Sequence, residues 1–310
     1  MNSQVSVCVF AYNEERTIRS TLQSILQQDY TDRIATVLVG ANGCTDGTVD
    51  RVIEVAQEDP RVKLLEVSER GKPNMWNVFR QAVNTPIGIF VDGDEVVSPC
   101  AVRQLVDVLE GDDRLIFATG SSREVYGGNY IAWLLAAPEQ LPVLISGRLY
   151  AANMANLEKA MARGGYETMP ARIIHEDDFL NCLVEHEQWR HVPTATCYHP
   201  TPRLRERFGR EVRGFASIRQ LEEEFPQFRR RLREFTELAD GRRDRLARWR
   251  TIRSPLKRTA LLLSYPLRRM VLSVVYPLAR RKGRAFYESG EYHRRWIRVE
   301  SEKVPLAPRP

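Results

Sequence analysis

The first 120 residues alternate between short apolar runs and amphipathic stretches, and this alternation constrains the fold more than any other feature. The apolar runs are rich in β-branched residues and have the length of buried strands; they cover residues 5–10, 36–40, 62–67, 87–91 and 115–119. Between them, segments such as 17–26 place apolar residues on one face of a helix. This order predicts parallel βαβ units in an open α/β sheet flanked by helices.

Polar clusters follow the first, second and fourth of these predicted strands. They begin at Ala11, Ala41 and Asp92, directly where each apolar run ends. In open α/β sheets, ligands bind beyond the carboxyl ends of the strands. We therefore expect the functional site at this edge of the sheet.

Charge is divided unevenly along the 310-residue chain. Residues 201–310 contain 29 lysines and arginines against 13 acidic residues, a net charge of +16, whereas residues 1–200 contain 17 against 27, a net charge of −10. A hydrophobic content of 43% excludes a disordered or collagen-like chain. The basic end favours an anionic partner. Because it contains no recognisable nucleic-acid-binding module, we do not expect that partner to be nucleic acid.

Cysteine usage indicates a reducing compartment. The five cysteines are scattered and form no C-x-x-C pair, which argues against a disulfide framework and against a structural zinc site. The first residues have neither the basic region nor the long apolar run of a secretory signal. These features predict a cytoplasmic protein.

Asp92-Gly93-Asp94 is the sharpest local motif. Two carboxylates separated by one residue after a strand can bind a hard divalent cation whose other ligands are phosphate oxygens. Taken alone, the same three residues also fit an ordinary turn, because aspartate and glycine favour turn conformations. The motif therefore indicates a metal site only in combination with other motifs of the chain.

Four further motifs accompany it in a fixed order. The five segments are 6–15 (with Ala11-Tyr12-Asn13-Glu14-Glu15), 42–48, 70–73 with Asn77, 92–94 and 175–180. Together they resemble the family 2 glycosyltransferases, from Val5 to about Arg213. The resemblance implies a GT-A (Rossmann-like) fold with an open, mainly parallel sheet flanked by helices. It also implies a nucleotide-sugar donor and transfer with inversion.

The resemblance assigns the donor site to the residues of these motifs. The expected nucleotide-sugar contacts are Ala11, Tyr12, Asn13, Glu14, Asn42, Asp46, Lys72, Asp92 and Gly93. Asn42 stands where the family usually has an acidic residue facing uracil, and its amide oxygen can accept a hydrogen bond from uracil N3–H. We therefore expect a UDP-sugar.

The metal site follows from the same resemblance. Asp94, together with Asp92, is expected to bind Mg²⁺ or Mn²⁺ at the donor diphosphate. His199 is the candidate that completes the site, although a single histidine in such a position is often structural or simply exposed.

The catalytic candidates are Asp177 and Glu176. The resemblance implies that Asp177 removes the proton from the acceptor hydroxyl and that Glu176 holds the acceptor or orients the base. An acidic first helical turn is the alternative interpretation of both residues. The segment 146–148 lies where the family often places a glycine-bearing loop under the donor sugar. We expect residues 120–170 to line the acceptor side.

Beyond residue 203 the sequence becomes rich in basic residues, and its apolar residues recur with helical spacing. We expect a catalytic domain over 1–215 and a basic helical region over 216–310. Two apolar runs, 259–267 and 270–279, are each followed by arginines. Arg268 and Arg269 would lie at the centre of a spanning helix, which opposes a transmembrane segment. Two short helices on the anionic cytosolic face of a membrane, or helices packed on the core or in an oligomer, both fit.

These observations predict a metal-dependent inverting glycosyltransferase acting on a glycan or lipid-linked acceptor. One alternative is a sugar-phosphate nucleotidyltransferase, whose glycine-rich basic loop after the first strand is missing here. Another is a non-catalytic nucleotide-sugar-binding or scaffold protein on the same fold, which the paired acidic motifs oppose.

Overall fold

A computed structural model describes residues 3–125, 145–234 and 255–290, with side chains from 255 to 272 included only at Thr259. The chain divides into two compact units, which we describe separately. Unit 1 contains the described residues up to Pro200, and unit 2 contains those from Thr201 onward. Segment 126–144, part of the expected acceptor side, lies outside the described residues.

Unit 1 is built on one eight-stranded sheet in the order β3-β2-β1-β4-β7-β6-β8-β5. Its strands are β1 (Val5–Ala11), β2 (Ile34–Asn42), β3 (Val62–Val67), β4 (Ile87–Asp92), β5 (Val96–Val97), β6 (Phe117–Val125), β7 (Leu149–Asn153) and β8 (Trp189–Pro200). The pairs along β3-β2-β1-β4 are parallel, as the βαβ pattern predicts. Strand β7 is antiparallel to both of its neighbours, and β6 and β8 pair in parallel. The sheet is therefore parallel in its first half and mixed in its second.

Helices cover both faces of this sheet. They are α1 (Ile18–Leu26), α2 (Thr48–Glu58), α3 (Lys72–Ala82), α4 (Ala101–Gly111), α6 (Met154–Arg163) and α7 (Glu176–Leu183), with short 3₁₀ turns at Thr31–Arg33 and His186–Gln188. Alternate residues of a strand point to opposite faces. Val5, Val7 and Val9 of β1 accordingly share a core with α1, α2 and α4. Phe10 instead packs on Phe79 of α3, with ring centroids 5.0 Å apart.

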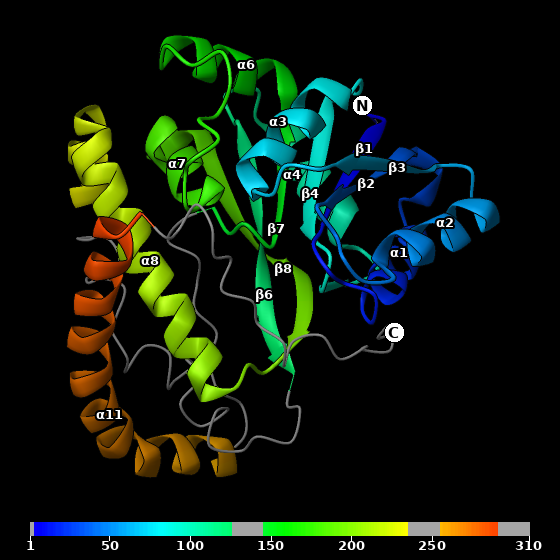
Figure 1. The fold of residues 1–310 in the computed structure, drawn as a ribbon. Helices are drawn as coiled ribbons and strands as arrows, with labels where there is room; N and C mark the ends of the chain where they lie inside the picture. The colour runs from blue at the N-terminus through cyan, green and yellow to red at the C-terminus, as the bar shows by residue number, and fades with distance from the viewer. Residues whose placement is uncertain (1–2, 126–144, 235–254, 291–310) are drawn as a thin grey trace. The chain divides into compact units, whose positions relative to one another are not determined.

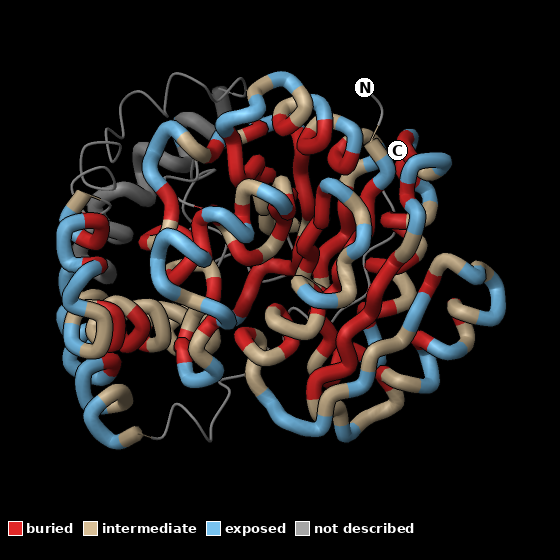
Figure 2. The backbone as a smooth tube through the Cα atoms, turned by 90° about the horizontal axis from the view of Figure 1, so that it is seen from above, coloured by how far each residue is buried: buried red, intermediate tan, exposed pale blue. Residues whose placement is uncertain are grey.

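Figure 2 shows the strands of unit 1 as mostly buried tubes and the outer turns of its helices as exposed. Figure 1 shows α3 lying across the sheet. Trp76 of this helix is fully buried, stacks near Phe90 and donates a hydrogen bond from Nε1 to the Tyr150 hydroxyl at 3.0 Å. The aromatic layer fixes α3, and with it the lysine at its first turn, against the carboxyl edge of the strands.

Unit 2 contains α8 (Leu204–Glu224), a 3₁₀ turn (Pro226–Phe228) and α11 (Pro255–Glu288). Helices α8 and α11 pack closely, since a Cβ added at Gly283 would lie 2.7 Å from the Val212 carbonyl oxygen. The apolar runs that we expected to form two short helices belong to one continuous helix, α11. Pro266 and Pro277 lie within it, and Figure 1 shows α11 bent, as internal prolines favour.

No helix in the described parts of the chain combines the length and apolarity needed to cross a membrane. Helix α8 runs through residue 215, where we expected the catalytic domain to end, whereas the compact units divide after Pro200. The division at residue 215 stays a prediction.

Candidate active site

The loops that follow β1 and β2 contact each other directly. Asn13 adopts the left-handed backbone conformation, with φ of 56°, and its side chain exchanges hydrogen bonds with Thr45. Nδ2 donates to Thr45 Oγ1 at 3.0 Å, and Oδ1 accepts from the Thr45 amide at 2.6 Å. The Glu14 amide donates to Thr48 Oγ1 at 2.7 Å, and Asp46 accepts from the Thr48 amide at the start of α2. We call these two loops, residues 12–15 and 42–48, the donor wall.

Three predicted donor contacts therefore have a structural part in the free protein. Asn13 and Asp46 hold the loops of the donor wall in place, and the buried Glu14 carboxylate accepts from Thr17 Oγ1 at 2.8 Å. Ala11 is buried at the end of β1. Tyr12 is half-buried, and the Arg70 guanidinium lies 5.5 Å from the centre of its ring. Arg70 lies in the 70–73 motif but is not among the predicted donor contacts.

Asn42 is the exception in this wall. It is buried at the end of β2, and its Oδ1 has no hydrogen-bond partner among the described residues. A buried acceptor without a donor costs about 1–3 kcal/mol. This oxygen is therefore the atom of the donor wall with the most to gain from a ligand N–H.

The Asp92-Gly93-Asp94 turn is held against β1. The Gly93 amide donates to the Phe10 carbonyl oxygen at 2.8 Å, and a Cβ at this position would lie 2.6 Å from the same oxygen. Glycine is required here because the two backbones approach so closely. The turn leaves Asp92 and Asp94 half-buried at the carboxyl edge of the sheet.

Lys72 connects this turn to the start of α7. Its Nζ lies 2.6 Å from Asp92 Oδ1 and 2.6 Å from Glu176 Oε1, and it donates to the Gly147 carbonyl oxygen at 3.1 Å. Burial lowers the pKa of Lys72, but attraction to Asp92 and Glu176 outweighs it and raises the pKa above its usual value. The lysine is therefore a fixed positive charge between two carboxylates.

Glu176 and Asp177 form the first turn of α7, and their environments differ. Glu176 is 3% exposed; burial raises its pKa to about 7, against the opposing effect of Lys72. Asp177 is more exposed, and its Oδ2 accepts a hydrogen bond from the Gly147 amide at 3.0 Å. Burial, and then the neighbouring Asp178, raise the pKa of Asp177. We call Lys72, Asp92, Gly147, Glu176 and Asp177 the catalytic wall.

This wall brings together predicted donor and catalytic residues, and it includes Asp92 of the three predicted metal ligands. The one cluster of potential metal ligands in the described parts of the chain is His175, Asp177 and Asp178, whose ligand atoms lie within 4.8 Å of one another. His199 is buried on β8, with Nδ1 3.4 Å from Ser122 Oγ and 3.7 Å from Glu95 Oε1. Asp92, Asp94 and His199 form no such cluster within the described ranges.

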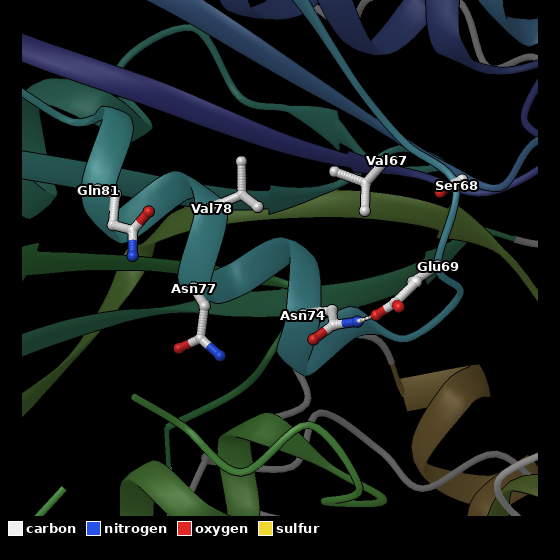
Figure 3. Close-up of a pocket in the computed structure, with 7 residues that line it drawn as sticks. All are labelled: Val67, Ser68, Glu69, Asn74, Asn77, Val78 and Gln81. Carbon is white, nitrogen blue, oxygen red and sulfur yellow. Dashed lines mark hydrogen bonds between the residues drawn. The ribbon is translucent and has the colours of Figure 1, made fainter. Parts of the chain in front are cut away.

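A separate hollow of about 390 Å³ lies beside the end of β3 and the outer side of α3 (Figure 3). Its lining residues are Val67, Ser68, Glu69, Asn74, Asn77, Val78 and Gln81. Asn74 donates to Glu69 across it at 3.0 Å. Asn77 exchanges two hydrogen bonds with the Met169 backbone, so this motif residue anchors the segment before α7. None of the predicted catalytic residues lines this hollow.

Known structures share this fold. The mannosyltransferase PcManGT from Pyrobaculum calidifontis, solved with GDP-Man and Mn²⁺, superposes with a TM-score of 0.58 at 21% identity, over 94% of this chain and 85% of that chain. TarS 1–349 of S. aureus, solved with UDP-GlcNAc, superposes with a TM-score of 0.53 at 14% identity, over 93% of this chain and 90% of that chain. The expected GT-A fold, an α/β sheet flanked by helices, is confirmed.

The family is established by sequence. Residues 6–160, half of the chain, match glycosyl transferase family 2, and the chain belongs to that family. Two curated relatives are an uncharacterized glycosyltransferase of Haemophilus influenzae, 31% identical over 129 residues, and the uncharacterized glycosyltransferase EpsJ of Bacillus subtilis, 33% identical over 121 residues. These matches cover 39% and 37% of this chain, and 37% and 33% of the relatives' lengths. The predicted family is confirmed.

Proposed function

We propose that the protein transfers a sugar from a nucleotide-sugar, a UDP-sugar by preference, to a hydroxyl group of a glycan or lipid-linked acceptor, with inversion. The observation that carries this proposal is the catalytic wall. Lys72, Asp92, Glu176 and Asp177 come from three different elements, and ion pairs and Gly147 join them at the carboxyl edge of the sheet. That edge is where an open α/β sheet binds its ligand.

The donor nucleotide fits the donor wall. The half-buried Tyr12 ring offers a face to a base, and Asn42 Oδ1 offers a buried acceptor to the N3–H of uracil. Arg70, beside Tyr12, and Lys72 supply positive charge for the diphosphate. The neighbours' bound GDP-Man and UDP-GlcNAc support a nucleotide-sugar as the ligand class.

We include a divalent metal in this proposal because two carboxylates and an imidazole suit such an ion, although Asp92, Asp94 and His199 form no ligand cluster among the described residues. Asp94, Asp92 and His199 would hold Mg²⁺ or Mn²⁺, since carboxylate oxygen and imidazole nitrogen are ligands that these ions accept. PcManGT, solved with Mn²⁺, supports a divalent metal as the class of cofactor. When bound, the ion neutralises negative charge on the departing nucleoside diphosphate.

Asp177 is our proposed general base. As the acceptor oxygen forms its bond to the anomeric carbon, the bond to the diphosphate oxygen breaks on the opposite face, and Asp177 takes the hydroxyl proton. Its raised pKa increases the basicity of the carboxylate. Glu176 is more deeply buried and ion-paired with Lys72, so it suits an orienting role.

The experiment that tests the base is Asp177→Asn. Donors are first identified by a thermal-shift screen of UDP- and GDP-sugars with Mn²⁺, and transfer is then measured with the donor that binds. We expect transfer to fall by about 10³-fold, with nucleotide affinity nearly unchanged. Asp50→Asn, the same change in the exposed first turn of α2, is the control. Full turnover by Asp177→Asn would contradict the assignment.

We also propose that unit 2 places the protein on the anionic, cytosolic face of a membrane. Val274 and Leu278 of α11 are 64% and 45% exposed, one helical turn apart. They are followed by the exposed Arg280, Arg281 and Lys282. Apolar side chains beside a basic cluster fit an anionic bilayer surface.

The membrane proposal is tested by flotation with vesicles of phosphatidylcholine containing or lacking phosphatidylserine. We expect binding only to the anionic vesicles, and weaker binding by the double variant Val274→Ser, Leu278→Ser. A concentration-dependent dimer without vesicle binding would contradict the proposal and favour an oligomer formed through these helices.

A further inference from the structure

One short segment contacts the catalytic wall from several sides. Residues 145–148, which we call the bridging segment, directly precede β7. The Gly147 amide donates to Asp177, and the Gly147 carbonyl accepts from Lys72. The Arg148 carbonyl accepts from the Asp92 amide at 3.1 Å. Three proposed site residues, on α7, α3 and β4, are therefore positioned against two consecutive residues.

The bridging segment has its own anchors. At one end, the Ile145 amide donates to Asn181 Oδ1 at 2.8 Å, and the Ser146 amide donates to Thr119 Oγ1 at 3.1 Å. At the other end, the Arg148 guanidinium forms an ion pair with Glu95. The Glu95 side chain is completely buried and directly follows the Asp92-Gly93-Asp94 turn. The ion pair therefore joins the bridging segment to the turn that carries the proposed metal ligands.

We propose that Arg148, held by Glu95, is a positioning residue that sets the distance between the donor side of the site and the proposed base. This inference rests on the proposed function. Arg148 acts through its own backbone and that of Gly147, which orient Asp92, Lys72 and Asp177. A guanidinium is suited to this role because its planar fork restricts the geometry of the pair.

A small displacement of this segment has a large expected effect. Gly147 carries both the hydrogen bond to Asp177 and the hydrogen bond from Lys72, so both groups follow its movement. A misplacement of about 1 Å in a catalytic constellation costs about 100-fold in rate. Loss of the Arg148 anchor should therefore lower kcat more than it raises the KM for the donor.

The experiment compares Arg148→Met with Arg61→Met in the full chain. Arg61 is the matched control because its guanidinium also forms an ion pair with a carboxylate, that of Asp59, but before β3, at the opposite edge of the sheet. Hydrogen exchange of peptides covering 145–149 is measured without ligand, beside thermal unfolding and kinetics with the donor found in the thermal-shift screen.

We expect the 145–149 amides of Arg148→Met to exchange about tenfold faster, with β1 and β2 peptides unchanged. kcat should fall by about 100-fold, with a smaller change in KM. Arg61→Met should change neither the exchange of the 145–149 amides nor kcat. Equal acceleration throughout unit 1 would show a merely structural role, and unchanged exchange at 145–149 would overturn the proposal.

A double variant separates the ion pair from the individual side chains. If Glu95 and Arg148 act as one unit, Glu95→Gln with Arg148→Met should be no worse than Arg148→Met alone. Additive losses would contradict the proposal. Since hydrogen exchange needs no substrate, a wild-type chain that transfers no sugar would count against the proposed function and leave the test of the anchor intact.

Discussion

The donor wall and the catalytic wall lie at the same edge of the sheet but are held in different ways. In the donor wall, Asn13, Thr45 and Thr48 link the loops through short hydrogen bonds. In the catalytic wall, the ammonium group of Lys72 forms ion pairs with the carboxylates of Asp92 and Glu176. The first arrangement fixes the shape of the loops before a nucleotide arrives. The second holds opposite charges in contact, and binding of a donor and an acceptor can change how these charges pair.

This difference predicts how each wall responds to mutation. Removing one member of a buried charge set leaves the others unpaired, whereas removing an unpartnered amide loses little in the free protein. Variants of the catalytic wall should therefore change both stability and rate, and a variant of Asn42 in the donor wall should change mainly affinity.

Lys72→Met should have the largest effect on stability. It leaves Asp92 and Glu176 close together without the ammonium group, and we expect the free energy of unfolding to fall by about 3 kcal/mol at pH 8. Denaturant unfolding measures the change. Arg61→Met, which removes a more exposed pair, should cost at most about 1 kcal/mol. Equal losses in the two variants would show that the charges of the catalytic wall stabilise the fold no more than a partly exposed ion pair does.

Gly147→Ala should act on rate. An added Cβ would lie 2.8 Å from Glu176 Oε1 and 3.1 Å from Asp177 Oδ2, so one or both carboxylates must move. We expect kcat to fall by about 100-fold. Gly111→Ala is the control, since nothing lies within 4 Å of its added Cβ. An unchanged kcat in Gly147→Ala would show that the catalytic wall tolerates displacement.

Glu176 should make stability depend on pH. Its pKa is raised from 4.5 to about 7 on folding, so the folded chain binds the proton more tightly than the unfolded chain. Its contribution is therefore present below pH 4.5 and is lost as the pH rises to about 7. Between pH 5 and 8, wild type should lose about 2 kcal/mol more than Glu176→Gln. Parallel pH profiles of unfolding would contradict this.

Asn42→Ala should have the smallest effect and should act on affinity alone. Its Oδ1 has no partner among the described residues, so the melting temperature should hardly change. Loss of the acceptor should weaken UDP binding, measured by calorimetry with Mn²⁺, by about tenfold. Asn74→Ala, in the hollow beside β3, is the control and should leave UDP affinity unchanged. A destabilised Asn42→Ala with normal affinity would assign Asn42 to the core instead.

The first half of the sheet was predictable because its signals are local. The run 5–10 becomes β1, and the run 62–67 becomes β3 with the predicted bounds. Strands β7 and β8 were not predicted. The alanine-rich Leu149–Asn153 has little strand propensity, and Trp189–Pro200 has no regular alternation in its burial.

The candidate site was predictable as a set of motifs but not as a set of contacts. The roles of Asp92, Lys72 and Asp177 came from recognisable local patterns. The pair of Glu95 and Arg148 joins residues 53 positions apart, which no local pattern reports. Glu95 had one usable signal, its place directly after Asp92-Gly93-Asp94. The merging of two apolar runs into α11 was missed because Pro266 and Pro277 usually indicate helix ends.

The sequence separation of the contacts in the two walls has a consequence for folding during synthesis. Contacts within the donor wall join residues 31 to 34 positions apart, whereas Lys72 reaches Gly147 across 75 positions. Contacts distant in sequence form later, and a chain emerging from the ribosome folds its early segments first. The loops of the donor wall can therefore fold before α7 has been synthesised. We expect a nascent chain to acquire its donor wall before it acquires its proposed base.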